Sequence, residues 1–230
     1  MKRVVAALSF LFVANAAYAD DANGFYLGAQ LGVMSGYSST EANDMALRLS
    51  GYTNVNSKMR DSGDVAGKSI LGYRLGHFAI EGHYFYSTLS QYSATFDLPS
   101  DPLRYGTQTK DRSVHGPGVS LLAFIPITSS LEAFGRVGYY RFTVTVDTKT
   151  SVGLSKNLLL APDAVASTES STHAASNIAS VGAGVALNLP ETGVSLRAEF
   201  EAFGEIGKPL GDEGRVTNGR MMSISAVYRY

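Results

Sequence analysis

The sequence predicts an all-β protein: an eight-stranded antiparallel transmembrane up-and-down β-barrel with four long extracellular loops and three short periplasmic turns. Three observations support this prediction. The chain begins with an export signal, eight segments alternate apolar and polar residues with a period of two, and the connections between these segments alternate between long and short. After residue 13, no apolar run reaches the eighteen or so residues that a membrane-spanning helix needs.

The first nineteen residues have the layout of a cleavable secretory signal. A cationic start is followed by the apolar run 4–13 and then by a small-x-small cleavage motif. We therefore expect residues 1–19 to be a signal peptide and residues 20–230 to form one barrel domain. The residues that define the cleavage site are Ala17, Ala19 and Asp20.

Composition excludes several classes of protein. The chain has 19 basic and 20 acidic side chains, and this near-balance provides no basic surface for nucleic acid. It has no cysteine, so an exported protein of this sequence must be stable without disulfides, through a large core, strand closure or lipid as its solvent. A mean hydropathy of +0.02 fits a soluble protein and a transmembrane barrel equally well, because only alternate barrel residues face lipid.

Each predicted strand has two different faces. In 24–34 the odd-numbered residues are apolar, whereas glycine and glutamine take most even-numbered positions. In 194–204 the same period places Ala198 toward lipid and Ser195 toward the lumen, near the periplasmic rim. We place the eight strands at 24–34, 65–75, 78–87, 114–125, 131–144, 177–189, 194–204 and 220–230.

The lengths of the connections separate a barrel from a soluble β-sandwich, whose strands can alternate in the same way. Sandwich connections are expected to be of mixed length, whereas outer-membrane barrels have short periplasmic turns, long extracellular loops and an even number of strands. Here the order is long, short, long, short, long, short, long, which predicts eight strands with both termini on the periplasmic side. The long links are 35–64, 88–113, 145–176 and 205–219, and the short ones are 76–77, 126–130 and 190–193.

Two further features refine the barrel. The segment 40–51 has weak helical spacing through Met45, Leu47 and Leu49 and predicts a short helix in the first long loop. Aromatic residues gather at strand ends, where their amphipathic rings suit the two membrane–water interfaces. They are Phe25, Tyr26, 84–86, Tyr139, Tyr140, Tyr228 and Tyr230.

These segments resemble a known family. The stretch 67–84 (GKSILGYRLGHFAIEGHY) looks like the second hairpin of the eight-stranded barrels typified by outer membrane protein A, and 134–139, 181–185 and 196–200 resemble that family's fifth to seventh strands. The ending Tyr228-Arg-Tyr230 is similar to the C-terminal signature that addresses such chains to the barrel-assembly machinery. Because no peptidoglycan-binding domain follows, the match is to barrel-only, opacity-type or porin-family relatives. The resemblance implies the bacterial outer membrane and roles in membrane integrity, adhesion and host or phage recognition.

The alternation also places charged side chains inside the barrel. An eight-stranded interior is just wide enough for side chains to fill it, and buried charges are tolerable only when they pair. We therefore interpret the set as a neutralised plug, with an ion pathway as the alternative. Its members are Lys68, Arg74, Glu81, His83, Glu132, Arg136, Arg197, Glu199, Glu201 and Arg229.

No motif for catalysis, cofactor or metal stands out. The four histidines, at 77, 83, 115 and 173, define no nucleophile–base pair, and there is no HExxH or nucleophile elbow. We expect no enzymatic activity, no cofactor and no metal. The apolar cluster 158–161 in the third long loop either packs on neighbouring loops or contacts lipopolysaccharide, a host molecule or a phage.

The sequence thus predicts an integral outer-membrane barrel with a structural and surface-interaction role. The alternative is a small porin-like channel for ions or hydrophobic solutes. The expected partners are outer-membrane lipid and lipopolysaccharide, the barrel-assembly machinery, and a host or phage surface ligand.

Overall fold

The computed structural model describes residues 23–37, 40–60, 64–99, 101–155, 166–210 and 217–230. The predicted signal peptide 1–19 with its cleavage residues Ala17, Ala19 and Asp20 lies outside the described residues, as does the apolar loop cluster 158–161. None of the helices in the described ranges is long and apolar enough to cross a membrane.

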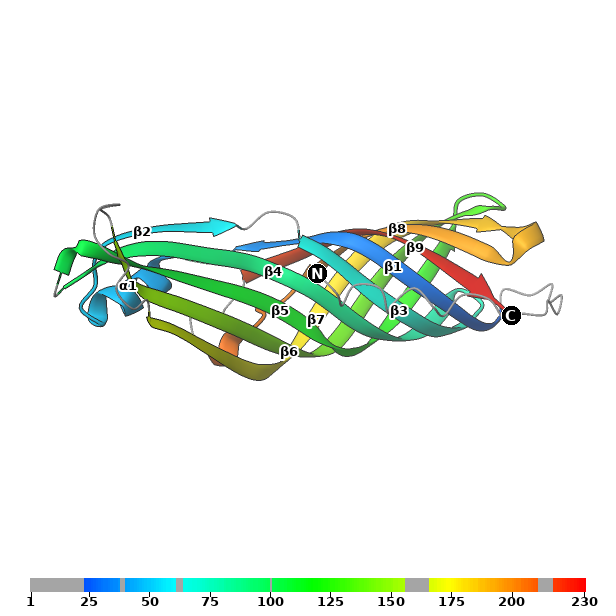
Figure 1. The fold of residues 1–230 in the computed structure, drawn as a ribbon. Coiled ribbons are helices and arrows are strands. Elements are labelled where there is room, and N and C mark those ends of the chain that lie inside the picture. The colour runs from blue at the N-terminus through cyan, green and yellow to red at the C-terminus, as the bar shows by residue number, and fades with distance from the viewer. Residues whose placement is uncertain (1–22, 38–39, 61–63, 100, 156–165, 211–216) are drawn as a thin grey trace.

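The described strands form a closed antiparallel ring of eight, which confirms the predicted fold class (Figure 1). Each strand pairs with the next around the ring, and the last pairs with the first, where Leu27 faces Tyr228. The ring strands are β1 (Gly24–Tyr37), β3 (Asp64–Leu75), β4 (Phe78–Leu98), β5 (Asp101–Pro126), β6 (Leu131–Ser155), β7 (Ala166–Leu189), β8 (Val194–Phe203) and β9 (Thr217–Arg229).

The three predicted short turns lie together at one end of the barrel. Gly76 (φ 56°) and Gly193 (φ 66°) take the left-handed backbone conformation that these tight connections require. The third of these turns contains the 3₁₀ helix η2 (Pro190–Thr192). A second 3₁₀ helix, η3 (Lys208–Leu210), lies in the fourth long connection, at the opposite end of the barrel.

The prediction that 88–113 and 145–176 are loops is wrong for most of these residues. Strands β4, β5, β6 and β7 run for 21, 26, 25 and 24 residues, well past what a bilayer needs. In 166–175 nearly every side chain is exposed, so the apolar–polar alternation that marks a strand is lost, whereas in 91–97 it persists and the inner residues Tyr92, Ala94 and Phe96 are buried. Threonine, valine and tyrosine still favour extended backbone in these segments, and hydrogen bonding to the neighbouring strands then determines how far each strand continues.

The first long connection is also folded. As predicted, 40–51 contains a helix, α1 (Glu41–Leu49), but of the three large apolar residues that predicted it only Leu47 is buried, while Met45 and Leu49 are 63% and 81% exposed. Strand β2 (Thr53–Arg60), which was not predicted, pairs with β4 beyond the end of the β3 pairing. We call β2 with 91–98, 101–113, 145–155 and 166–176 the protruding sheet (Figure 1).

The two faces of the barrel wall follow the predicted period. Ala198 faces outward and Ser195, 2% exposed, faces the lumen, as expected. The aromatic prediction is only partly right, because neighbouring residues must point to opposite faces. Residues 84, 86 and 139 face outward as interface tyrosines, and Phe25 also lies outside. Tyr26, Phe85 and Tyr140 instead lie in the lumen with no exposed surface.

Candidate functional site: the lumen and the protruding sheet

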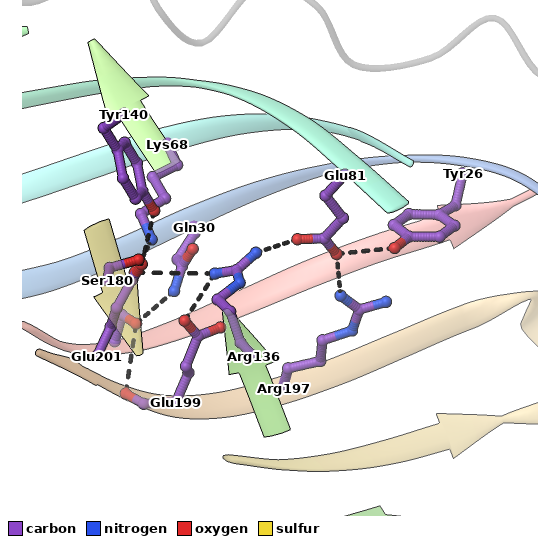
Figure 2. Close-up of polar contacts among 11 residues, drawn as sticks. Tyr26, Gln30, Lys68, Glu81, Arg136, Tyr140, Ser180, Arg197, Glu199 and Glu201 are labelled. Atoms are coloured by element: carbon purple, nitrogen blue, oxygen red, sulfur yellow. Dashed lines mark hydrogen bonds and ion pairs between the residues drawn. The ribbon is translucent and has the colours of Figure 1, made fainter. Parts of the chain in front are cut away.

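The structure places all ten predicted lumen residues on the inner side of the wall. Eight are 8% exposed or less, whereas Glu132 and Arg229 are part-buried near the short turns. Most of the carboxylates and cations contact each other across the lumen, and His83 stands apart. Figure 2 shows the central group.

Glu81 is the first hub of this network. Its carboxylate accepts hydrogen bonds from the Tyr26 hydroxyl at 2.8 Å and from the Arg197 guanidinium at 2.6 Å, and it forms an ion pair with Arg136 (Figure 2). These groups come from β4, β1, β8 and β6, so one buried carboxylate joins four strands. A carboxylate with three donors, two of them cationic, is well compensated for its loss of water.

Glu201 is the second hub. It forms a buried ion pair with Lys68 and accepts hydrogen bonds from the Tyr140 hydroxyl at 2.7 Å and the Ser180 hydroxyl at 2.6 Å. Arg136 connects the two hubs, because its other nitrogen donates to Glu199 at 2.6 Å and lies 3.8 Å from Glu201. The network is therefore continuous across the lumen (Figure 2).

Sequence reasoning missed the neutral members of this site. The predicted lumen network contained only charged residues and His83, although the same period of two puts tyrosine, serine and amide side chains on the lumen face. These neutral groups supply donors that the carboxylates need, and Gln30 additionally donates to Ser223 at 2.5 Å. The missed residues that form hydrogen bonds in the lumen are Tyr26, Gln30, Tyr140, Ser180, Asn188 and Ser223.

A separate polar group closes the end with the short turns. The Arg74 guanidinium donates two parallel hydrogen bonds to Glu132, at 2.8 and 2.6 Å, in the bidentate geometry that arginine favours with carboxylates. Asn188 donates to Glu132 at 2.9 Å and accepts from Arg229 at 3.3 Å.

Apolar layers lie above and below the central network. Along β6 the inward residues read Glu132, Phe134, Arg136, Gly138, Tyr140 and Phe142, so the charged Arg136 lies between aromatic levels. Toward the short turns, the layer contains Tyr26, Ile70, Leu122, Phe124 and Phe134 among others. Toward the protruding sheet, it contains Met34, Phe85, Phe142, Phe203, Ile206 and Met221 among others.

The histidines do not assemble a catalytic or metal site in the described ranges. His83 is 6% exposed and its ring lies 4.6 Å from that of Tyr140, but neither of its nitrogens has a hydrogen-bond partner among the described residues. His115 shares a hydrogen bond of 3.0 Å with the Tyr84 hydroxyl, and His77 and His173 are exposed. No group of three His, Cys, Asp or Glu side chains converges in the part of the chain that the structure describes.

A second cluster of polar contacts fastens the first long connection to the protruding sheet. The Asp44 carboxylate on α1 accepts hydrogen bonds from the Tyr92 hydroxyl at 2.7 Å and the Ser57 hydroxyl at 2.8 Å. The neighbouring Asn43, which is fully buried, accepts one from Lys110 at 2.8 Å. Below them, Leu47 packs with Tyr92, Ala94 and Phe96.

Further out on the same sheet, Lys149 and Glu169 form an exposed ion pair at 2.8 Å. The hydrogen bond and the negative charge of Glu169 raise the pKa of Lys149 above its ordinary value. Water surrounds this pair, so it adds little to stability.

A closed ring of eight antiparallel strands, with apolar side chains outside and a paired polar interior, defines an outer-membrane β-barrel. The family model of the OmpA-like transmembrane domain matches residues 20–230. The chain belongs to this family and is an integral protein of the bacterial outer membrane.

Three solved structures are similar in fold. Neisserial surface protein A aligns with a TM-score of 0.49 and 16% identity over 90% of this chain and 97% of its own. Ail, the attachment invasion locus protein of Yersinia pestis, aligns with a TM-score of 0.41 and 11% identity, over 90% of this chain and 97% of its own. Ail in complex with the heparin analogue sucrose octasulfate aligns with a TM-score of 0.38 and 11% identity, over 90% and 99%. No match is found among curated proteins.

Proposed function

We propose that this protein is a non-enzymatic surface protein whose barrel anchors and supports the membrane while its protruding sheet binds a host or phage ligand. One observation carries the proposal: four ring strands continue far beyond the barrel, and the first connection is folded onto them. A barrel that served only membrane integrity would need no such extension.

The protruding sheet is suited to binding because it is ordered before a partner arrives. A surface held by strand pairing and by the Asp44 contacts loses less conformational entropy on binding than free loops do. At its outer part, helix α1 presents Met45 and Leu49, which are 63% and 81% exposed. They are four residues apart, so they share one side of the helix and form a small apolar contact.

The layered lumen argues against the alternative of a channel. The central charges are paired, and aromatic layers lie on both sides of them. We expect the purified protein to give no steady openings in planar bilayers. Steady single-channel currents that vanish in Glu199→Gln would favour the channel.

The lack of enzymatic activity is part of the proposal. The carboxylate of Glu201, for example, already accepts hydrogen bonds from the hydroxyls of Ser180 and Tyr140. His77 and His173 are exposed, and no serine or acidic side chain in the described ranges is hydrogen-bonded to either.

The proposal is tested by shortening the protruding sheet. In a strain lacking the gene, residues 92–110 and 148–170 are each replaced by an Asn-Gly turn, which suits a two-residue hairpin. We expect normal barrel abundance and normal detergent resistance but loss of adhesion to host cells or of phage adsorption. Met45→Ser combined with Leu49→Ser should reduce the same readout, and Arg48→Gln on the same helix is the matched control. Unchanged adhesion and phage adsorption in the shortened protein would refute the binding role.

A further inference from the structure

The outer wall of the barrel carries an arginine at the edge of its apolar surface. Arg141 on β6 faces outward and is exposed, one outward position beyond Tyr139. Asn177 lies directly across from it on β7. On the β5 side, Pro117 falls opposite, between the paired positions His115–Thr143 and Gly118–Tyr140. No acidic residue occupies these facing positions, and no ion pair joins Arg141 to another residue in the described ranges.

The level of Arg141 follows from the length of the apolar surface on β7. Its six outward residues from Leu189 to Ala179 are all apolar and exposed. At about 3.4 Å per residue and a tilt of about 40°, they span about 26 Å along the membrane normal, which matches the apolar band of about 25 Å in such barrels. Asn177 is the next outward residue, and it is the first polar one. Arg141, paired with it, therefore lies where the acyl chains of the outer leaflet end.

The surroundings of Arg141 fit a membrane boundary. Tyr84 and Tyr139 on the same outer face are 50% and 53% exposed, and the Tyr84 hydroxyl bonds to the His115 ring at 3.0 Å. Amphipathic rings occupy this level in outer-membrane barrels. Pro117 lies exposed between Tyr84 and Arg141, and its short side chain leaves the Arg141 guanidinium accessible.

We propose that Arg141, with Asn177 beside it, binds a phosphate group of lipopolysaccharide in the outer leaflet. A guanidinium presents donors in a fork that matches two phosphate oxygens, and the Asn177 amide can donate a further hydrogen bond. The acyl chains of the same lipid lie on the apolar wall below, which includes Val119, Val137 and Val181 at 55%, 56% and 61% exposure. Apolar contact and phosphate contact together select a phosphorylated lipid over free phosphate.

Lys149 provides a matched control on the same strand. It is also an exposed cation on the outer face of β6, but it lies well above the boundary and is paired with Glu169 at 2.8 Å. A general attraction of basic side chains for anionic lipid would involve both cations, whereas the proposed site includes Arg141 and not Lys149.

The test measures binding of fluorescent bisphosphorylated lipid A to the protein in a non-ionic detergent, which contains no phosphate. Only heat-modifiable, and hence folded, protein is counted. Arg141→Gln should weaken binding about tenfold or more, since a charge-assisted bidentate contact is removed. Arg141→Lys should weaken it less, because the charge remains without the fork, and Lys149→Gln should bind like the wild type.

Two ligand comparisons identify the group that is recognised. Dephosphorylated lipid A should bind the wild type no more tightly than bisphosphorylated lipid A binds Arg141→Gln. Millimolar inorganic phosphate should not displace the lipid. The proposal is overturned if Arg141→Gln keeps wild-type affinity, if the dephosphorylated lipid binds equally well, or if inorganic phosphate competes at that concentration.

Discussion

The Arg197 guanidinium donates a hydrogen bond of 2.6 Å to the Glu81 carboxylate, joining two strands that lie on opposite sides of the ring. Backbone pairing connects each strand only to its neighbours, so such contacts brace the barrel from within. Glu81 has no exposed surface and Arg197 is 4% exposed, so neither can exchange its partner for bulk water.

Removal of Glu81 should therefore be costly. Glu81→Ala leaves Arg136 and Arg197 buried without their shared carboxylate, and we expect it to lower the free energy of unfolding by about 3–5 kcal/mol. Urea unfolding of the protein in liposomes measures this loss. Glu169→Gln, which breaks the exposed pair with Lys149, is the control and should leave unfolding unchanged. Similar unfolding curves for the two variants would mean that the lumen network does not stabilise the barrel.

A glycine on the lumen face should be intolerant of even one added methyl group. A Cβ at Gly72 would lie 2.1 Å from Cζ of Tyr26, the side chain that donates to Glu81. Gly72→Ala should cost about 1–3 kcal/mol through overpacking. Gly135 faces outward with nothing within 4 Å of its Cβ position, so Gly135→Ala should be neutral or slightly stabilising. The same unfolding assay compares them, and equal stabilities would contradict the packing described for Tyr26.

The lipid-facing wall should reject a charge at mid-membrane. Ala198 faces outward and is paired with Val185 in the middle of the apolar wall. Ala198→Arg should cost about 2–4 kcal/mol, the range found for arginine at the bilayer midplane. Ala175, also exposed on the outer face, lies beyond the membrane boundary, so Ala175→Arg should fold almost as well as the wild type. Folding yields in liposomes distinguish the two, and equal yields would refute the assigned level of the membrane.

The C-terminal residues should be needed for closure. Tyr228 faces Leu27, and the backbone N–H of Tyr230 donates to the carbonyl of Phe25 at 3.1 Å. Deleting 228–230 leaves backbone groups of β1 unpaired against lipid, at several kcal/mol each, and removes two interfacial rings. Export should continue, but the amount in the outer membrane should fall sharply.

Fractionation with heat-modifiability gels measures the effect of this truncation. Tyr230→Phe keeps an aromatic ring and should behave like the wild type. If the truncated protein reaches the outer membrane at normal abundance and remains heat-modifiable, β9 does not close the barrel through these residues.

The amino-acid sequence by itself determined the number of ring strands, their order and the face on which each side chain lies. In β8, for example, the alternation alone assigns Ala198 to lipid and Arg197, Glu199 and Glu201 to the lumen. This works because a strand has a strict period of two, and because lipid and a narrow interior demand opposite residue types. The length of β7 beyond the membrane was not accessible in this way, since residues 166–175 meet water on both sides. The β4 extension does alternate in 91–97, and only the structure shows that it continues the pairing with β5.

Only the tertiary structure decided which lumen residues meet. Lys68 and Glu201 are 133 positions apart, and their pairing depends on the stagger and tilt at which the ring closes. The period of two indicates which face of the strand a residue lies on. It does not give the level of that residue along the barrel axis relative to residues on strands across the lumen. For the same reason the role of Tyr26 and Tyr140 as donors to Glu81 and Glu201 became visible only once the barrel was closed.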